Sequence, residues 1–333
     1  MKFSVGYQLR EAGVLPFYKI AEQYRKAIEE VYFPWPALAS GRDPLPEGAE
    51  ETLIRELQEI QKLGIRLNLL LNGNCYGSEA MSEKLAETIA GIFDRLGDES
   101  CKPQVVTTAS PAIAFMVKRI SPQTELRASV NMRIGSVKGM EYTGHLFDSF
   151  YVCRDHNRDL ERVRELKQWA DENGKKLYLQ ANSGCLRNCS FQTFHDNLVS
   201  HHDEVEGNRN ISGFLPYACW NHLKNPKNWV SVLQNTWIRP EDVHRYEPYV
   251  SMMKLATRMH RLPMMVIDAY AKESYGGNLL DLLEPGVGPA FAPYILDNRR
   301  FPEDWFERTT QCDKKCKICG YCRGVLERIL VEN

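Results

Sequence analysis

Segments typical of buried strands alternate with segments of helical periodicity along most of this 333-residue chain. Seven or eight strand–helix units without a long linker favour a TIM-like (β/α) barrel closed by parallel strands, regular or irregular. Strands are predicted at 3–8, 28–33, 66–71, 104–108, 125–132, 149–153, 177–181 and 251–256, and helices at 15–25, 50–63, 81–96, 112–120, 158–173 and 263–270.

An open doubly wound sheet is the nearest alternative fold, but the glycine-rich phosphate turn typical of it is missing after the first predicted strand. From about Asn278 onward the chain is rich in Pro, Gly and aromatic residues and no longer alternates. We therefore predict a barrel over residues 1–277 and, over 278–333, a cysteine-rich extension that packs on it.

Composition is ordinary for a globular protein, with 43% hydrophobic and 26% charged residues. The formal net charge of −1 gives the protein no overall electrostatic attraction to nucleic acids or membranes. Because there is no apolar signal segment and no apolar run near 18 residues, we expect a cytoplasmic protein without membrane insertion. Ten cysteines in a reducing compartment favour metal ligands, redox groups or buried thiols over disulfides.

Three of these cysteines follow the strand predicted at 177–181: Cys185 and Cys189 directly, and Cys219 beyond a polar loop. Cys75 follows the strand at 66–71. Because the carboxyl ends of barrel strands meet at one rim, we expect these four thiolates to hold a 4Fe–4S cluster. Cys153 competes with Cys75 for the fourth position, and burial as small hydrophobic residues is the alternative for Cys75 and Cys219.

Four more cysteines crowd near the C-terminus with three, two and two residues between them: Cys312, Cys316, Cys319 and Cys322. Neighbouring lysine and arginine residues favour thiolates, so we predict a second metal centre, an iron–sulfur cluster with zinc as the alternative. The first three also spell the CxxxCxxC signature of radical S-adenosylmethionine enzymes. That motif usually follows the first barrel strand. Here Cys322 would also occupy the coordination site on the iron that must stay free to bind S-adenosylmethionine. We therefore expect no such chemistry.

Three histidines, His195, His201 and His202, follow Cys189 at roughly helical spacing. They form either a surface helix or a polar lining beside the cluster that moves protons or holds an anionic substrate. No Walker motif, serine–histidine–acid pattern or HExxH zinc helix stands out in the sequence.

Three stretches resemble the collagenase-like peptidase family U-32 over roughly residues 1–270. The first, 27–33, reads AIEEVYF and is similar to the family's early aDavYfG strand, with Pro34 in place of the glycine. The second is the turn at 185–195. The third comprises 237–242 and 253–258, which resemble the closing irPeDl…LKIeGR pattern with Ala256 and Thr257 in place of its Glu-Gly pair.

The resemblance implies a barrel-like fold, a 4Fe–4S cluster on four cysteines, and oxygen-independent hydroxylation of quinone precursors or RNA bases. A short, near-neutral chain favours a small molecule over RNA. We therefore expect an iron–sulfur redox enzyme in which His195, Lys254 and Arg258 are the candidate catalytic residues and the C-terminal centre relays electrons from a donor or protein partner. A zinc-dependent hydrolase or peptidase, or a non-catalytic electron-transfer or scaffold protein, is the alternative.

Overall fold

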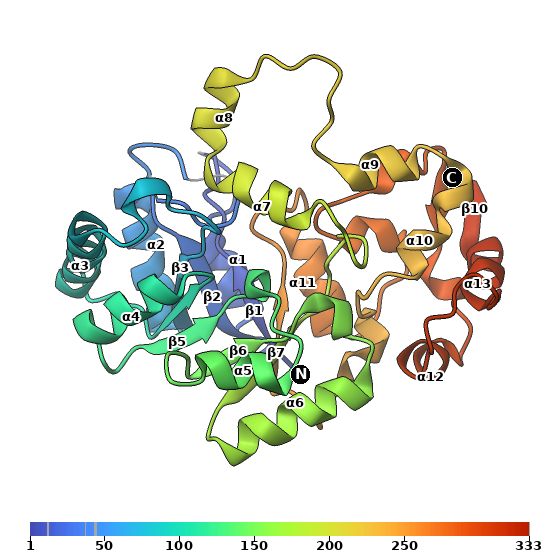
Figure 1. The fold of residues 1–333 in the computed structure, drawn as a ribbon, viewed down its shortest axis with the longest axis horizontal. Coiled ribbons are helices and arrows are strands. Elements are labelled where there is room, and N and C mark those ends of the chain that lie inside the picture. Colours follow the sequence, from blue (N-terminus) through green and yellow to red (C-terminus); the bar gives the residue numbers. More distant parts are fainter. Residues whose placement is uncertain (12, 37, 43–44, 333) are drawn as a thin grey trace.

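The computed structural model describes residues 1–11, 13–36, 38–42 and 45–332. Its centre is a closed barrel of parallel strands that pair in chain order, with the last strand returning to the first (Figure 1). The strands are β1 (Lys2–Gly6), β2 (Ile28–Pro34), β3 (Arg66–Leu71), β4 (Val105–Thr108), β5 (Glu125–Ala128), β6 (Ser149–Tyr151), β7 (Lys176–Gln180) and β8 (Met252–Leu255). The predicted TIM-like barrel is confirmed.

Helices surround the barrel and follow its strands in sequence. The amphipathic α2 shows why: Leu53, Leu57 and Ile60 recur at helical spacing and are buried. The helices are α1 (Phe17–Gln23), α2 (Glu50–Lys62), α3 (Glu83–Asp98), α4 (Pro111–Ile120), α5 (Val137–Thr143), α6 (Leu160–Glu172), α7 (Gln192–Ser200), α8 (His202–Asn208), α9 (Ala218–Leu223), α10 (Val230–Leu233), α11 (Pro263–Ala271), α12 (Trp305–Thr310) and α13 (Tyr321–Ile329).

The barrel interior contains a buried polar layer besides its apolar side chains. Glu30 on β2 accepts hydrogen bonds from Ser4 Oγ at 2.7 Å and from Asn68 Nδ2 at 2.8 Å. Arg127 on β5 donates to the same carboxylate at 2.7 Å, and neither member of this ion pair is exposed. Because both charges are hydrogen-bonded, the layer links four strands without leaving a charge unpaired.

The segment between β7 and β8 is much longer than the other connections and holds α7, α8, α9 and α10 (Figure 1). α7 and α8 project from the barrel, and the chain then crosses over to α9 on the side where the C-terminal extension lies. This insertion carries Cys219 and the three histidines noted in the sequence. It therefore positions the candidate site.

The C-terminal extension adds a two-stranded antiparallel sheet, β9 (Tyr294–Leu296) with β10 (Leu330–Glu332), and α12 and α13. Trp305 of α12 stacks on Trp237 with ring centroids 5.7 Å apart, and the apolar residues of the extension belong to the same core as those of the barrel. A single bridge from Ser183 to Glu284 brings the extension back to the end of β7. The division at residue 277 stays a prediction.

The helices formed by the described residues are all too short or too polar to cross a lipid bilayer.

Candidate functional site at the barrel mouth

The carboxyl end of the barrel is a strongly cationic pocket. Arg42 precedes α2, Arg154 follows β6, Lys254 ends in the pocket from β8, and Arg258 lies just beyond β8. Glu284, from the C-terminal extension, is an acidic residue in the same lining. Four basic side chains around one carboxylate make the mouth suited to an anionic ligand.

Lys254 is the most perturbed base of this pocket. Its side chain is only 9% exposed, and its ammonium lies 4.4 Å from the centre of the Tyr32 ring. Burial, and then the positive charges of Arg258 and Arg42, lower the pKa of Lys254 from 10.5 to about 7. Lys254 can therefore hold or release a proton near neutral pH, as a general acid or base must.

Arg258 is held against the end of β1. Its Nη1 donates to Ser40 Oγ at 2.9 Å, and a Cβ built on Gly6 would come within 2.7 Å of the Arg258 Cβ. Gly6 thus lets the segment after β8 pack tightly against β1. Glu284 lies nearby, and burial raises the pKa of its carboxyl although Arg42 and Arg258 oppose the shift.

Arg154 connects the pocket to the cysteines. Its side chain is 6% exposed and lines the mouth, and its Nη1 donates to Cys185 Sγ at 3.4 Å. The amide of Gln192, at the start of α7, lies against the same guanidinium. A buried cation therefore contacts both the barrel mouth and the first thiol of the predicted cluster.

The structure brings Cys185, Cys189 and Cys219 together. Burial raises the pKa of Cys219, and the neighbouring thiols of Cys185 and Cys189 add to that rise. Cys189 and Cys219 also line a common cavity of about 390 Å³. The sequence predicted this grouping because the three cysteines follow the end of one predicted strand. That the three cysteines bind a cluster stays a prediction.

Cys316 and Lys314 of the C-terminal extension line this same cavity. The four C-terminal cysteines lie close enough to affect one another's ionisation. Burial raises the pKa of Cys322 to about 11, and the charges of Cys312, Cys316 and Cys319 add to this rise although Arg158 opposes it. The Lys314 backbone N–H donates to Cys312 Sγ at 3.3 Å. One cysteine of the C-terminal set thus shares a cavity with two of the barrel set, although more than ninety positions separate the two sets in sequence.

Cys75 is not part of this group. The Asn74 backbone N–H donates to Ser200 Oγ at 2.8 Å at the C-terminal end of α7, whereas Cys189 precedes the N-terminal end of that helix. Nine helical residues span about 13 Å, so the arrangement does not support Cys75 as the fourth ligand. The loop that begins at Cys153 does contact the Cys185–Cys189 loop, because Asp155 accepts a hydrogen bond from Asn188 N–H at 3.2 Å.

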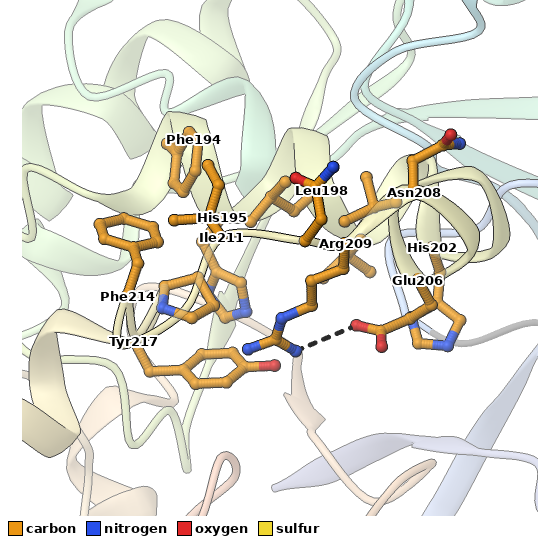
Figure 2. A pocket seen from close by; sticks show the side chains of 14 residues that line it. Phe194, His195, Leu198, His202, Glu206, Asn208, Arg209, Ile211, Phe214 and Tyr217 are labelled. Carbon is orange, nitrogen blue, oxygen red and sulfur yellow. Dashed lines mark hydrogen bonds and ion pairs between the residues drawn. The ribbon is translucent and has the colours of Figure 1, made fainter.

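The three histidines of the insertion occupy different places. His195 lies in an apolar pocket of about 330 Å³ between α7, α8 and residues 209–217, with its ring against Tyr217. Figure 2 shows Phe194 and Phe214 on one side of this pocket and the Arg209–Glu206 ion pair on the other. Burial and the nearby Arg42 lower the pKa of His195. His202 also lines this pocket, and His201 and His202 both line a second groove.

Among the residues that the structure describes, no group of three or more His, Cys, Asp or Glu side chains is arranged to hold a single metal ion. Thiolates around one zinc ion lie about 4 Å apart, since each Zn–S bond is about 2.3 Å. A four-iron cluster holds its thiolates further apart, because the iron atoms lie between them. A more open group of cysteines is therefore compatible with a cluster.

Sequence reasoning missed Arg42, Arg154 and Glu284. Arg154 had a signal, since it follows the end of a barrel strand, where functional residues concentrate. No sequence signal marked Arg42 or Glu284. The long loop before α2 carries Arg42 to the mouth, and the C-terminal extension carries Glu284 there.

The fold and site define a (β/α) barrel with a cationic mouth flanked by cysteines. No protein-family model matches the chain. A curated relative, "Uncharacterized protease MJ1657" of Methanocaldococcus jannaschii, is 26% identical over 320 residues, which cover 94% of this chain and 92% of the relative. The solved structure of the U32 peptidase Mk0906 superimposes with a TM-score of 0.53 and 16% identity, covering 76% of this chain and 92% of that one. Together these likenesses support a relationship to the U32 family, as the sequence resemblance predicted.

Proposed function

We propose that this protein is a redox enzyme that holds a 4Fe–4S cluster on Cys185, Cys189 and Cys219 and acts on a small anionic molecule in the barrel mouth. The observation that carries the proposal is the position of Arg154. This buried guanidinium lines the mouth and donates to Cys185 Sγ. Cluster and substrate would then be neighbours.

The donor set fits such a group. Three thiols converge, all of them on half-buried residues, and the cavity that Cys189 and Cys219 line has room for a cofactor beside them. A cationic neighbour such as Arg154 offsets thiolate charge. Cys153, carried by a loop that touches the Cys185–Cys189 loop, is our preferred fourth thiolate.

The cluster, when bound, would supply one-electron transfer. Arg42 and Arg258 would bind and orient the anionic part of the substrate. Lys254 would hold or release a proton at its Nζ, because its pKa of about 7 keeps both forms populated near neutral pH. Oxygen-independent hydroxylation is the specific reaction that the family resemblance suggests. His195 lines the pocket between α7 and α8 rather than the mouth, and its catalytic role stays a prediction.

The C-terminal cysteines are proposed as a second cluster that relays electrons from a donor. Because Cys316 shares a cavity with Cys189 and Cys219, the two centres would be neighbours. Zinc, the alternative metal for this second site, would need these thiols to move closer together, because no group among the described residues is arranged to hold a single ion.

Anaerobic purification tests the proposal. We expect a brown protein that contains iron and acid-labile sulfide and whose visible absorption bleaches with dithionite. A colourless protein that contains zinc without sulfide would refute it.

A metal-dependent hydrolase is the second candidate, favoured by the word protease in the name of the curated relative. It predicts a zinc-containing protein that cleaves a peptide library and stops doing so when zinc is chelated. A redox enzyme would leave the library uncut.

A further inference from the structure

A separate nucleophilic group lies at the far end of α7. A groove of about 660 Å³ runs between the segment after β3, α3 and the start of α8, and Cys75 and His201 both line it. The other charged side chains in its lining are Arg42, Glu79, Lys84, His202, Asp203 and Glu204. Arg42 also lines the barrel mouth, so this one side chain borders both cavities.

The loop that carries Cys75 is fixed on both sides. The Tyr76 hydroxyl donates to the Ala39 carbonyl at 3.0 Å and accepts from Gly73 N–H at 3.1 Å. Asn74 N–H donates to Ser200 Oγ at 2.8 Å, which ties the loop to the last turn of α7. These hydrogen bonds therefore fix the backbone that carries the Cys75 thiol beside the groove.

His201 and Glu204 complete a chain of three groups. His201 lies beside the Cys75 loop: it lines the same groove as Cys75, and a Cβ built on Gly77 would lie 3.6 Å from His201 Cε1. Its Nδ1 lies 3.4 Å from Glu204 Oε2. The backbone N–H of Gly77 donates to Cys75 Sγ at 3.4 Å, with Gly77 at a φ of +54°, where glycine is favoured.

The electrostatics agree with this geometry. The hydrogen bond from His201, followed by that from Gly77, lowers the pKa of Cys75. The same contact with the sulfur raises the pKa of His201. A thiolate paired with an imidazolium, oriented in turn by a carboxylate, is the arrangement of an activated cysteine nucleophile.

We propose that Cys75 and His201 form a nucleophile–acid/base pair, with Glu204 as a weak positioning residue, that cleaves a carboxylic ester or thioester independently of the cluster. The Cys75 sulfur attacks the acyl carbon, so that an S–C bond forms while the bond to the leaving group breaks. His201 gives its proton to the leaving group. Water then attacks the thioester, His201 takes a proton from it, and the carboxylic acid leaves with the thiol restored.

The test uses 4-nitrophenyl acetate and the full chain purified with its metal. We expect a burst of about one 4-nitrophenolate per chain, which Cys75→Ala abolishes. His201→Gln should slow acylation by about a hundredfold, because the imidazolium that keeps Cys75 in the thiolate form is lost. Glu204→Gln should slow it by less than about threefold, because the Glu204 side chain is 80% exposed and its ion pair is weak. The exposed His145 gives the control His145→Gln, which should leave the burst unchanged.

Two further measurements separate a nucleophile from a ligand or a structural residue. Cys75→Ala should retain the full iron content of the wild type; loss of iron would make Cys75 a ligand and overturn the proposal. In the unmodified protein, iodoacetamide should alkylate Cys75 before the buried Cys101 when labelling is read by peptide mass spectrometry. A burst that persists in Cys75→Ala, or is unchanged in His201→Gln, would also overturn it.

Discussion

Replacing Lys254 with methionine should change how the stability of the protein depends on pH. Burial makes the ammonium form unfavourable in the folded state, so the pKa of Lys254 falls from 10.5 to about 7 on folding. Between these two values the unfolded chain binds more protons than the folded one. The free energy of unfolding of the wild type therefore rises with pH across that window, and the full penalty is present below about pH 7.

The size of this penalty follows from the shift. A tenfold change in proton affinity is worth about 1.4 kcal/mol, so the fall from 10.5 to about 7 corresponds to roughly 5 kcal/mol at most. Methionine has a similar length and no charge to bury. Lys254→Met should thus be more stable than the wild type below pH 7, by up to roughly this amount, and the advantage should shrink toward pH 10.

Urea denaturation followed by circular dichroism, at matched metal content and at several pH values from below 7 to near 10, measures this difference. Lys62 on α2, whose side chain is 70% exposed, gives the matched control Lys62→Met. A difference between Lys254→Met and wild type that varies by less than about 1 kcal/mol over the range would refute the argument.

Three other predictions concern the cysteines and their neighbours. Arg154→Gln should lower the reduction potential of the cluster by tens of millivolts, because it removes a positive charge from Cys185; an unchanged potential in a redox titration would contradict this. The double variant Cys316→Ser/Cys319→Ser should lose about half of the iron by chemical analysis and keep the barrel's share, and full retention would exclude these two as ligands. Substitution is preferable to truncation here, since α13 buries Val325, Leu326 and Ile329. Reduced, reconstituted protein should release no deoxyadenosine from S-adenosylmethionine; release that depends on Cys316 would move the active centre to the C-terminus.

Most of the barrel could be predicted because each strand carries its own signal. β3 spans the predicted 66–71, since its residues are almost all buried and leave little ambiguity. The strand predicted at 125–132 ends instead at Ala128. Ser129 accepts a hydrogen bond from Asn131 N–H and begins a short 3-10 helix, a side-chain cap that an apolar pattern does not reveal.

Only those residues of the candidate site that directly follow a barrel strand could be placed from the sequence. Cys185 and Cys189 directly follow β7, so their place at the rim follows from topology. Cys75 also follows a strand, but the packing of its loop against Ser200 places it at the opposite end of α7. Glu284 reaches the mouth through a single bridge to Ser183, a contact across about a hundred residues that no local pattern encodes.

The central claim is that Cys185 holds a cluster beside the cationic mouth, and iron analysis of one pair of variants tests it most directly. Cys185→Ala and Cys101→Ala are purified anaerobically beside the wild type; Cys101 is fully buried in the core and serves as the control. The account predicts that Cys185→Ala loses the barrel's iron and sulfide while Cys101→Ala keeps both. Full iron in Cys185→Ala would contradict it.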